Sequence, residues 1–259
     1  MTNEQESKKI MLESLIWLHN FCEENNINYF MIGGTLLGSV RHKGFIPWDD
    51  DIDIAMPRED YERFILLQSK ITAPYSFEHY STNSSVHFSF IKFFNSKLRV
   101  SESGYKNYNP GVWIDIFPLD FTFSDPDERS LQFKKIKFYR RILSYKNASF
   151  YNSSMKNIAK NFISFFLEAI PIRALLKKID RLEKLSDDKV LIANLHGTWG
   201  DKEVVPANLI SSKKLYEFEG NYFWSFSDCD KWLSSVYGDY MKLPPESDQI
   251  ARHGVVYAE

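Results

Sequence analysis

The chain has 259 residues, 44% of them hydrophobic and 25% charged, a composition typical of a folded globular protein and not of a disordered one. Its formal charge of −2 provides no basic surplus, so we expect no nucleic-acid partner. The two cysteines form no CxxC motif, and the polar N-terminus does not resemble a signal peptide, so we expect a cytoplasmic protein without a disulfide framework.

Hydrophobic periodicity and turn residues predict an α+β fold with a mixed sheet flanked by helices. Helices are expected over 4–25, 35–42, 58–69, 125–145, 155–185 with a break near Pro171, and 228–237. Strands are expected over 28–32, 51–56, 75–79, 86–95, 98–102 and 112–117. Because strands give way to helices near 120–125, we predict a catalytic core over 1–122 and a mainly helical extension over 123–259, whose tail (218–259) packs back on the core.

Four acids lie within five positions, at Asp49, Asp50, Asp51 and Asp53. On a strand, side chains alternate between faces, so Asp51 and Asp53 are expected on one face, about 6.5 Å apart, where they can share a hard cation. Such a concentration of negative charge is costly without a positive partner. We therefore expect Mg²⁺ or Mn²⁺ with a substrate phosphate, and Asp49 as an additional ligand.

Two further segments fit a phosphate site. Gly33, Gly34 and Thr35 follow an apolar run, and glycines there let the backbone approach a phosphate and offer N–H donors at a helix start. Asp115 lies between apolar residues on the predicted strand 112–117 and supplies a third carboxylate. The alternative for Asp115 is a turn acid at the strand end, before Pro118.

Three other interpretations of the acids are weaker. A solvated loop does not explain the interleaved isoleucines and the flanking Trp48. An EF-hand requires Gly at its sixth position and Glu at its twelfth, where this chain has Ile54 and Asp60. A glycosyltransferase DxD motif normally follows a nucleotide-binding α/β half, for which the residues before Asp51 leave little room.

The segment 41–53, RHKGFIPWDDDID, with DYERF at 60–64, resembles the LicD family, which includes bacterial phosphocholine transferases and is related to fukutin-type ribitol-phosphate transferases. The tail is similar as well, with FEG at 218–220, VYGDYM at 236–241 and Pro-Pro at 244–245. The similarity runs from about residue 10 to the end of the chain and departs from the family pattern at 221–225, NYFWS.

This resemblance implies a nucleotidyltransferase-like fold and the transfer of phosphocholine, or a related phosphoalcohol, from a CDP-linked donor. CDP-choline is the expected donor, and the acceptor is a hydroxyl of a cell-surface glycan or its lipid-linked precursor, with CMP as the leaving group. Asp51 and Asp53 would hold the metal, and Asp115 would complete the site and accept the proton of the attacking hydroxyl. The alternatives are a nucleotidyltransferase that releases pyrophosphate from a nucleoside triphosphate, and a degenerate fold that only binds nucleotide.

Basic and aromatic residues near the acids are candidate substrate contacts. Arg41 can hold a pyrophosphate through its planar fork, or can be an exposed base at a helix end. Lys92, inside an apolar run, points into a cleft or lies at a sheet edge. His42 is a further candidate contact, and Trp48 could stack on cytosine or face the choline ammonium, or could simply pack the sheet.

Residues 156–179 raise the question of membrane contact. Their apolar stretch, 162–172, is too short to span a bilayer, which needs about 20 residues. Lysines flank it, as they would on a helix lying in the bilayer interface, which would place the protein peripherally on the cytoplasmic face. The alternative is a pair of core helices broken at Pro171.

Overall fold

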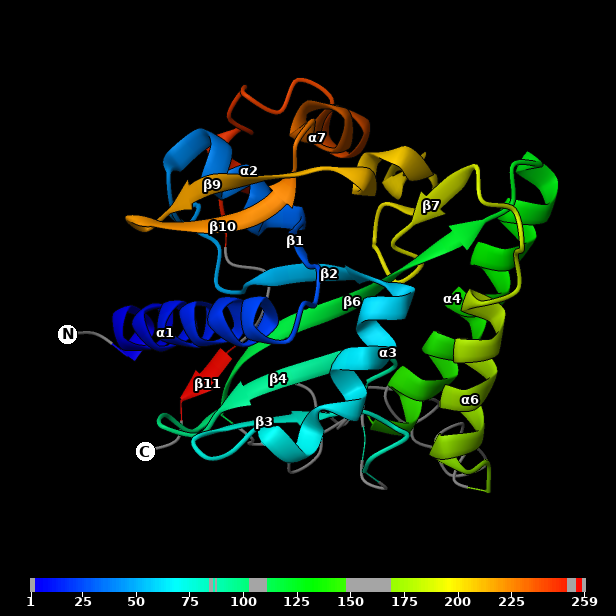
Figure 1. Ribbon diagram of the computed structural model, residues 1–259, viewed down its shortest axis with the longest axis horizontal. Coiled ribbons are helices and arrows are strands. Elements are labelled where there is room, and N and C mark those ends of the chain that lie inside the picture. The colour runs from blue at the N-terminus through cyan, green and yellow to red at the C-terminus, as the bar shows by residue number, and fades with distance from the viewer. Residues whose placement is uncertain are drawn as a thin grey trace.

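A computed structural model describes residues 3–83, 86, 88–102, 111–147, 169–250 and 255–257. Within these ranges, a mixed seven-stranded sheet runs through the centre of the molecule (Figure 1). Five strands lie in the order β1 (Phe30–Met31), β2 (Asp53–Pro57), β6 (Val112–Thr122), β4 (Ile91–Asn95) and β3 (Tyr75–Glu78). The far end of β6 also pairs with β7 (Leu191–Ala193), which pairs with β8 (Val204–Pro206). Only β2 and β6 run parallel within this described sheet, so the fold is α+β, as predicted.

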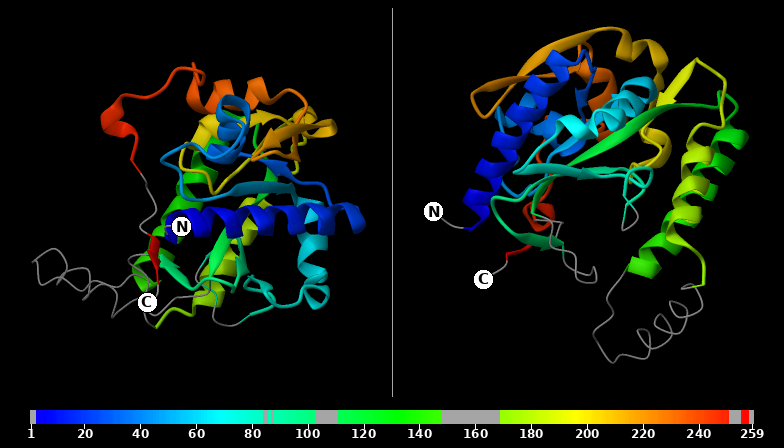
Figure 2. Two further views of the ribbon diagram at one scale, coloured as in Figure 1. Left: turned by 90° about the vertical axis from the view of Figure 1, so that its left-hand side faces the viewer. Right: turned by 60° about the horizontal axis from the view of Figure 1, so that its bottom comes forward.

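Six α-helices and two small sheets surround the central sheet in the described ranges. The helices are α1 (Asn3–Glu24), α2 (Gly33–His42), α3 (Arg58–Leu66), α4 (Pro126–Asn147), α6 (Ile172–Glu183) and α7 (Cys229–Tyr237). The small sheets pair β9 (Lys213–Phe218) with β10 (Asn221–Phe226), and β5 (Val100–Glu102) with β11 (Val255–Tyr257). Short 3₁₀ turns cover Gln68–Lys70, Gly200–Glu203, Ala207–Ser211 and Glu246–Asp248. Helices α4 and α6 lie side by side at one end of the sheet (Figure 2).

Helix α1 shows how the apolar pattern places the core. Its stripe of Met11, Leu15, Leu18 and Cys22 is buried, as the helical spacing predicts. Trp17, on the neighbouring turn, stacks on Phe93 of β4, with ring centroids 5.6 Å apart. The helix therefore covers one face of the sheet.

Several predicted boundaries were wrong. Strand β2 begins at Asp53, so Asp51 lies in the loop before it, although the sequence predicted a strand from residue 51. Strand β4 begins at Ile91 instead of residue 86. Strand β6 runs past Pro118 to Thr122, because its last three residues pair with β7. Strands β7, β8, β9, β10 and β11 were not predicted.

An ionic network joins the sheet to α3 and α6. Arg58 opens α3 and donates to both carboxylate oxygens of Asp120 on β6, at 2.6 and 2.5 Å, and to Glu183 Oε2 on α6 at 2.9 Å. His196 Nε2 lies 2.6 Å from the other Glu183 oxygen. Burial alone would raise the pKa of the Glu183 carboxyl, but His196 and Arg58 together lower it to about 2. Glu183 is therefore ionised inside the protein, and Arg58 joins it to Asp120 of the sheet.

None of the helices in the described ranges is long and apolar enough to cross a membrane. Most of the segment 156–179 lies outside these ranges, and only its end is described, as the start of α6. The predicted membrane contact through this segment stays a prediction.

Candidate active site

A cavity of about 1530 Å³ opens where β2, β4 and β6 meet α2, α4 and α7. Of the site residues predicted from the sequence, it is lined by Gly33, Gly34, Arg41, Trp48, Asp49, Asp51, Asp53, Lys92 and Asp115. Thr35 and His42 are not among the lining residues. Residues separated by more than 80 positions in the sequence thus converge on one cavity.

Three charged residues occupy paired positions on neighbouring strands. Asp53 of β2 pairs in register with Asp115 of β6, which pairs with Lys92 of β4. Paired residues on adjacent strands project from the same face of a sheet. Lys92 Nζ lies 3.3 Å from Asp115 Oδ1, and its ammonium sits between the rings of Phe88 and Trp113, 4.4 and 4.2 Å from their centroids. Because β4 has a paired strand on each side, Lys92 is not at a sheet edge.

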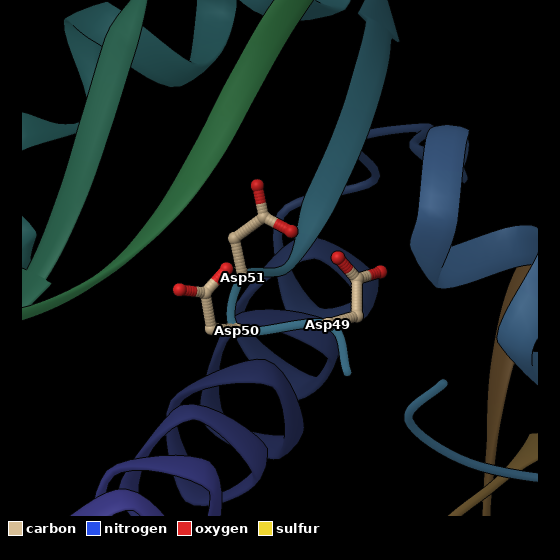
Figure 3. Close-up of side chains that lie close together, drawn as sticks. All are labelled: Asp49, Asp50 and Asp51. Carbon is tan, nitrogen blue, oxygen red and sulfur yellow. The ribbon is translucent and has the colours of Figure 1, made fainter. Parts of the chain in front are cut away.

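The loop before β2 brings three further carboxylates together (Figure 3). One oxygen from each of Asp49, Asp50 and Asp51 lies within 4.8 Å of the others, with Asp51 buried and the other two half-buried. Asp50 was not a predicted ligand, because strand alternation would turn it away from Asp51. The backbone here is a loop, so alternation does not apply.

The carboxylates raise one another's proton affinity. The pKa of Asp53 is raised well above its ordinary value, first by burial and then by the charges of Asp51, Asp115 and Asp49. The neighbouring charges therefore make ionisation of Asp53 unfavourable. Carboxylate oxygens are the ligands that Mg²⁺ and Mn²⁺ prefer, so the residues present fit a hard divalent cation.

The two glycines at the start of α2 leave room for these carboxylates. Gly33 has φ of +55°, and a Cβ there would lie 2.8 Å from Asp53 Oδ2. A Cβ on Gly34 would overlap the carboxylate of Asp49. Thr35 ties α2 to β2, since its Oγ1 accepts the backbone N–H of Asp53 at 2.8 Å. The predicted contact of Thr35 with substrate stays a prediction.

Gly33→Ala is therefore expected to reduce activity by about 10²-fold, because it displaces the Asp53 carboxylate, and to destabilise the fold by about 1–2 kcal/mol through its left-handed backbone. Gly220→Ala is the matched control, since Gly220 has φ of +71° with nothing within 4 Å of an added Cβ. Urea unfolding should show similar losses for both variants, and only the first should lose turnover. Equal activity in the two variants would contradict the role assigned to Gly33.

Arg41 and His42, both candidate substrate contacts, have partners within the protein. Arg41 Nη1 donates to the backbone oxygen of Tyr240 at 2.9 Å, so part of its fork holds the C-terminal segment that lines the cavity. His42 meets the ring of Trp48 edge-on, with centroids 6.4 Å apart. Arg41 and Trp48 line the cavity, and His42 contacts Trp48 without lining it.

The sequence did not indicate the wall formed by Trp199, Glu203 and Tyr237. Glu203 is buried, and burial raises its pKa to about 7, although hydrogen bonds from Trp199 N–H and Asn194 oppose the shift. In the sequence, Glu203 belongs to a polar turn, DKE, which is typical of an exposed loop. Helix α4 contributes four basic residues to the lining, Lys134, Lys137, Arg140 and Arg141. The charge of Arg140 also opposes the rise in the pKa of Glu203.

Comparison with known proteins identifies the family. The family model for the LicD/FKTN/FKRP nucleotidyltransferase domain matches residues 26–160. The lipopolysaccharide cholinephosphotransferase LicD of Haemophilus influenzae is 30% identical over 262 aligned positions, which cover 96% of this chain and 95% of that protein. The human ribitol 5-phosphate transferase FKRP is 35% identical over 52 residues, which are 20% of this chain and 10% of that protein. The sheet, the acids on its central strands and these similarities together show that the chain belongs to the LicD/FKTN/FKRP family.

Proposed function

We propose that this protein transfers phosphocholine, or a related phosphoalcohol, from a CDP-linked donor to a hydroxyl of a cell-surface glycan or its lipid-linked precursor, releasing CMP. The observation that carries the proposal is the alignment of Asp53 and Asp115 on parallel strands at the cavity, beside the acidic loop at Asp51. Membership of the LicD/FKTN/FKRP family supports the more general assignment of the chain as a phosphotransferase.

The acids are assigned as follows. Asp51, Asp53 and Asp115 would hold Mg²⁺ or Mn²⁺, with Asp49 as an additional ligand. A bound divalent ion supplies neutralisation of the pyrophosphate charge as the bond to CMP lengthens. Asp115, oriented by Lys92 at 3.3 Å, accepts the proton of the attacking hydroxyl. The basic residues of α4 and Arg41 make the rest of the cavity favourable for an anionic substrate.

The second candidate is transfer of a nucleotidyl group from a nucleoside triphosphate, favoured by the nucleotidyltransferase domain to which residues 26–160 match. The products separate the two reactions. Incubation with Mg²⁺, a lipopolysaccharide acceptor and CDP-choline, CDP-glycerol or CDP-ribitol should release CMP from at least one donor. Pyrophosphate release from a nucleoside triphosphate, without CMP from any of the three, would replace the proposal with the second candidate.

Donor binding should depend on the metal. We expect CDP-choline at 100 times its dissociation constant to stabilise the protein by about 2.7 kcal/mol in the presence of Mg²⁺, and by much less in EDTA. Thermal unfolding with and without the metal measures this linkage. Mg²⁺ alone is the control for stabilisation by the ion itself. Equal protection by CDP-choline in EDTA would show that the acids do not hold a metal bound to the donor.

A further inference from the structure

Trp199 and Tyr237 form an aromatic corner in the wall of the cavity. Trp199 follows β7 and is 41% exposed, which is unusual for so large an apolar side chain unless it meets a partner. Tyr237 ends α7, and the two rings meet edge to face, with centroids 5.6 Å apart and planes inclined by 76°. Both side chains line the cavity. Two inclined rings present the kind of concave π surface that binds organic cations.

A fixed carboxylate accompanies this corner. Glu203 accepts the backbone N–H of Trp199 at 3.1 Å and the side-chain N–H of Asn194 at 2.9 Å. Both donors are neutral, and Glu203 forms no ion pair with any residue that the structure describes. Gly197 lies so close that any Cβ there would overlap the carboxylate. The fold therefore holds a buried acid against the cavity without a direct ion pair among the described residues, and the charge of Arg140 on α4 acts on it from a distance.

The corner is adjacent to the predicted metal site. The pKa of Tyr237 is raised by burial first, and then by the charges of Asp53 and Glu203, so its hydroxyl lies within electrostatic reach of both acids. In phosphocholine, only two carbons separate the ester oxygen from the nitrogen. The ammonium of a donor whose phosphate lay at the acids would therefore be a short distance from them, and Tyr237 lies in that neighbourhood.

We propose that Trp199, Tyr237 and Glu203 bind the quaternary ammonium of a choline headgroup and so select a choline-bearing donor over a polyol-bearing one. This inference rests on the proposed function and specifies the donor alcohol. A trimethylammonium group donates no conventional hydrogen bonds, so aromatic faces and a carboxylate are its natural partners. The ring of Trp199 is partly exposed, and it already attracts one cation, since Lys202 Nζ lies 5.4 Å from its centroid.

The test compares CDP-choline with CDP-glycerol, which share the nucleotide and the pyrophosphate. Trp199→Leu should raise the KM for CDP-choline by about tenfold and leave that for CDP-glycerol within twofold, because only choline loses a cation–π contact. Trp199→Phe should recover part of the loss. Tyr222→Leu is the control, since Tyr222 is 59% exposed on β10 and does not line the cavity.

Glu203→Gln keeps the shape of the side chain, removes its charge and should also raise KM selectively for CDP-choline. If Trp199→Leu fails to fold, Glu203→Gln tests the choline pocket in its place. Equal effects on both donors, or a wild-type preference for CDP-glycerol, would overturn the choline pocket and leave phosphoalcohol transfer intact. The absence of CMP from every CDP-alcohol would instead refute the proposed function.

Discussion

Asp53→Asn is expected to lower CMP release by at least about 10²-fold and, in metal-free protein at pH 7, to raise the free energy of unfolding. Activity falls because a charge is lost from the metal site. Stability rises because the pKa of Asp53 is higher in the folded protein than in the unfolded chain, so its ionisation at neutral pH opposes folding. A pKa raised in this way makes wild type lose stability as the pH increases, so the advantage of the variant should shrink toward pH 4.

Two measurements test this prediction: CMP release with saturating Mg²⁺, and urea unfolding in EDTA at pH 7 and pH 4. Asp187→Asn removes an exposed carboxylate of the same type and should change neither quantity appreciably. Near-wild-type turnover in Asp53→Asn would remove Asp53 from the metal site. A large loss of stability would instead show that its carboxylate supports the fold.

Arg58→Met should destabilise the protein by about 3–5 kcal/mol, since it leaves the carboxylates of Asp120 and Glu183 buried without their shared guanidinium. Ionised Glu183 contributes stability above the ordinary pKa of a glutamate, and this contribution is lost as the pH falls toward about 2. The loss in free energy of unfolding caused by Arg58→Met is therefore largest near neutral pH. It becomes smaller in acid, where the carboxylates of Asp120 and Glu183 take up protons.

Lys97→Met provides the comparison on the surface. Lys97 pairs with Glu13 at 2.8 Å, but the two side chains are 50% and 38% exposed, and such pairs contribute about 0–1 kcal/mol. Urea unfolding of both variants at pH 7 and pH 4 should separate the two classes. A loss below about 1 kcal/mol for Arg58→Met would mean that the network does not tie α6 to the sheet.

The sequence predicts best where local pattern and chemistry coincide. The acids, the glycines before them and the apolar strand around Asp115 were predicted from the sequence to form one site, and the fold brings these residues together at the cavity. The sequence predicts the loop before β2 less well, because the expected strand, with its alternating side chains, began two residues too early. Asp50 therefore joins a cluster from which the sequence pattern excluded it.

Other features depend on contacts between distant segments. Glu203 lies close enough to Asp53 to raise its pKa only because β7 and β8, each three residues long, extend the sheet from β6. Strands this short give too few alternations to be recognised. The β9–β10 hairpin did carry a signal: Phe218, Phe223 and Phe226 are buried, and Glu219 and Gly220 both have positive φ, as a tight hairpin turn requires.

The register of β2 against β6 links catalysis to the accuracy of folding. A slip of one residue would turn the Asp53 carboxylate into the core and present Ile54, which is 0% exposed, to the cavity. A chain paired in this way would have neither a sound core nor a complete set of acids. Activity per mole of protein is therefore proportional to the fraction of molecules whose central strands are correctly paired. The turnover of a refolded preparation measures that fraction.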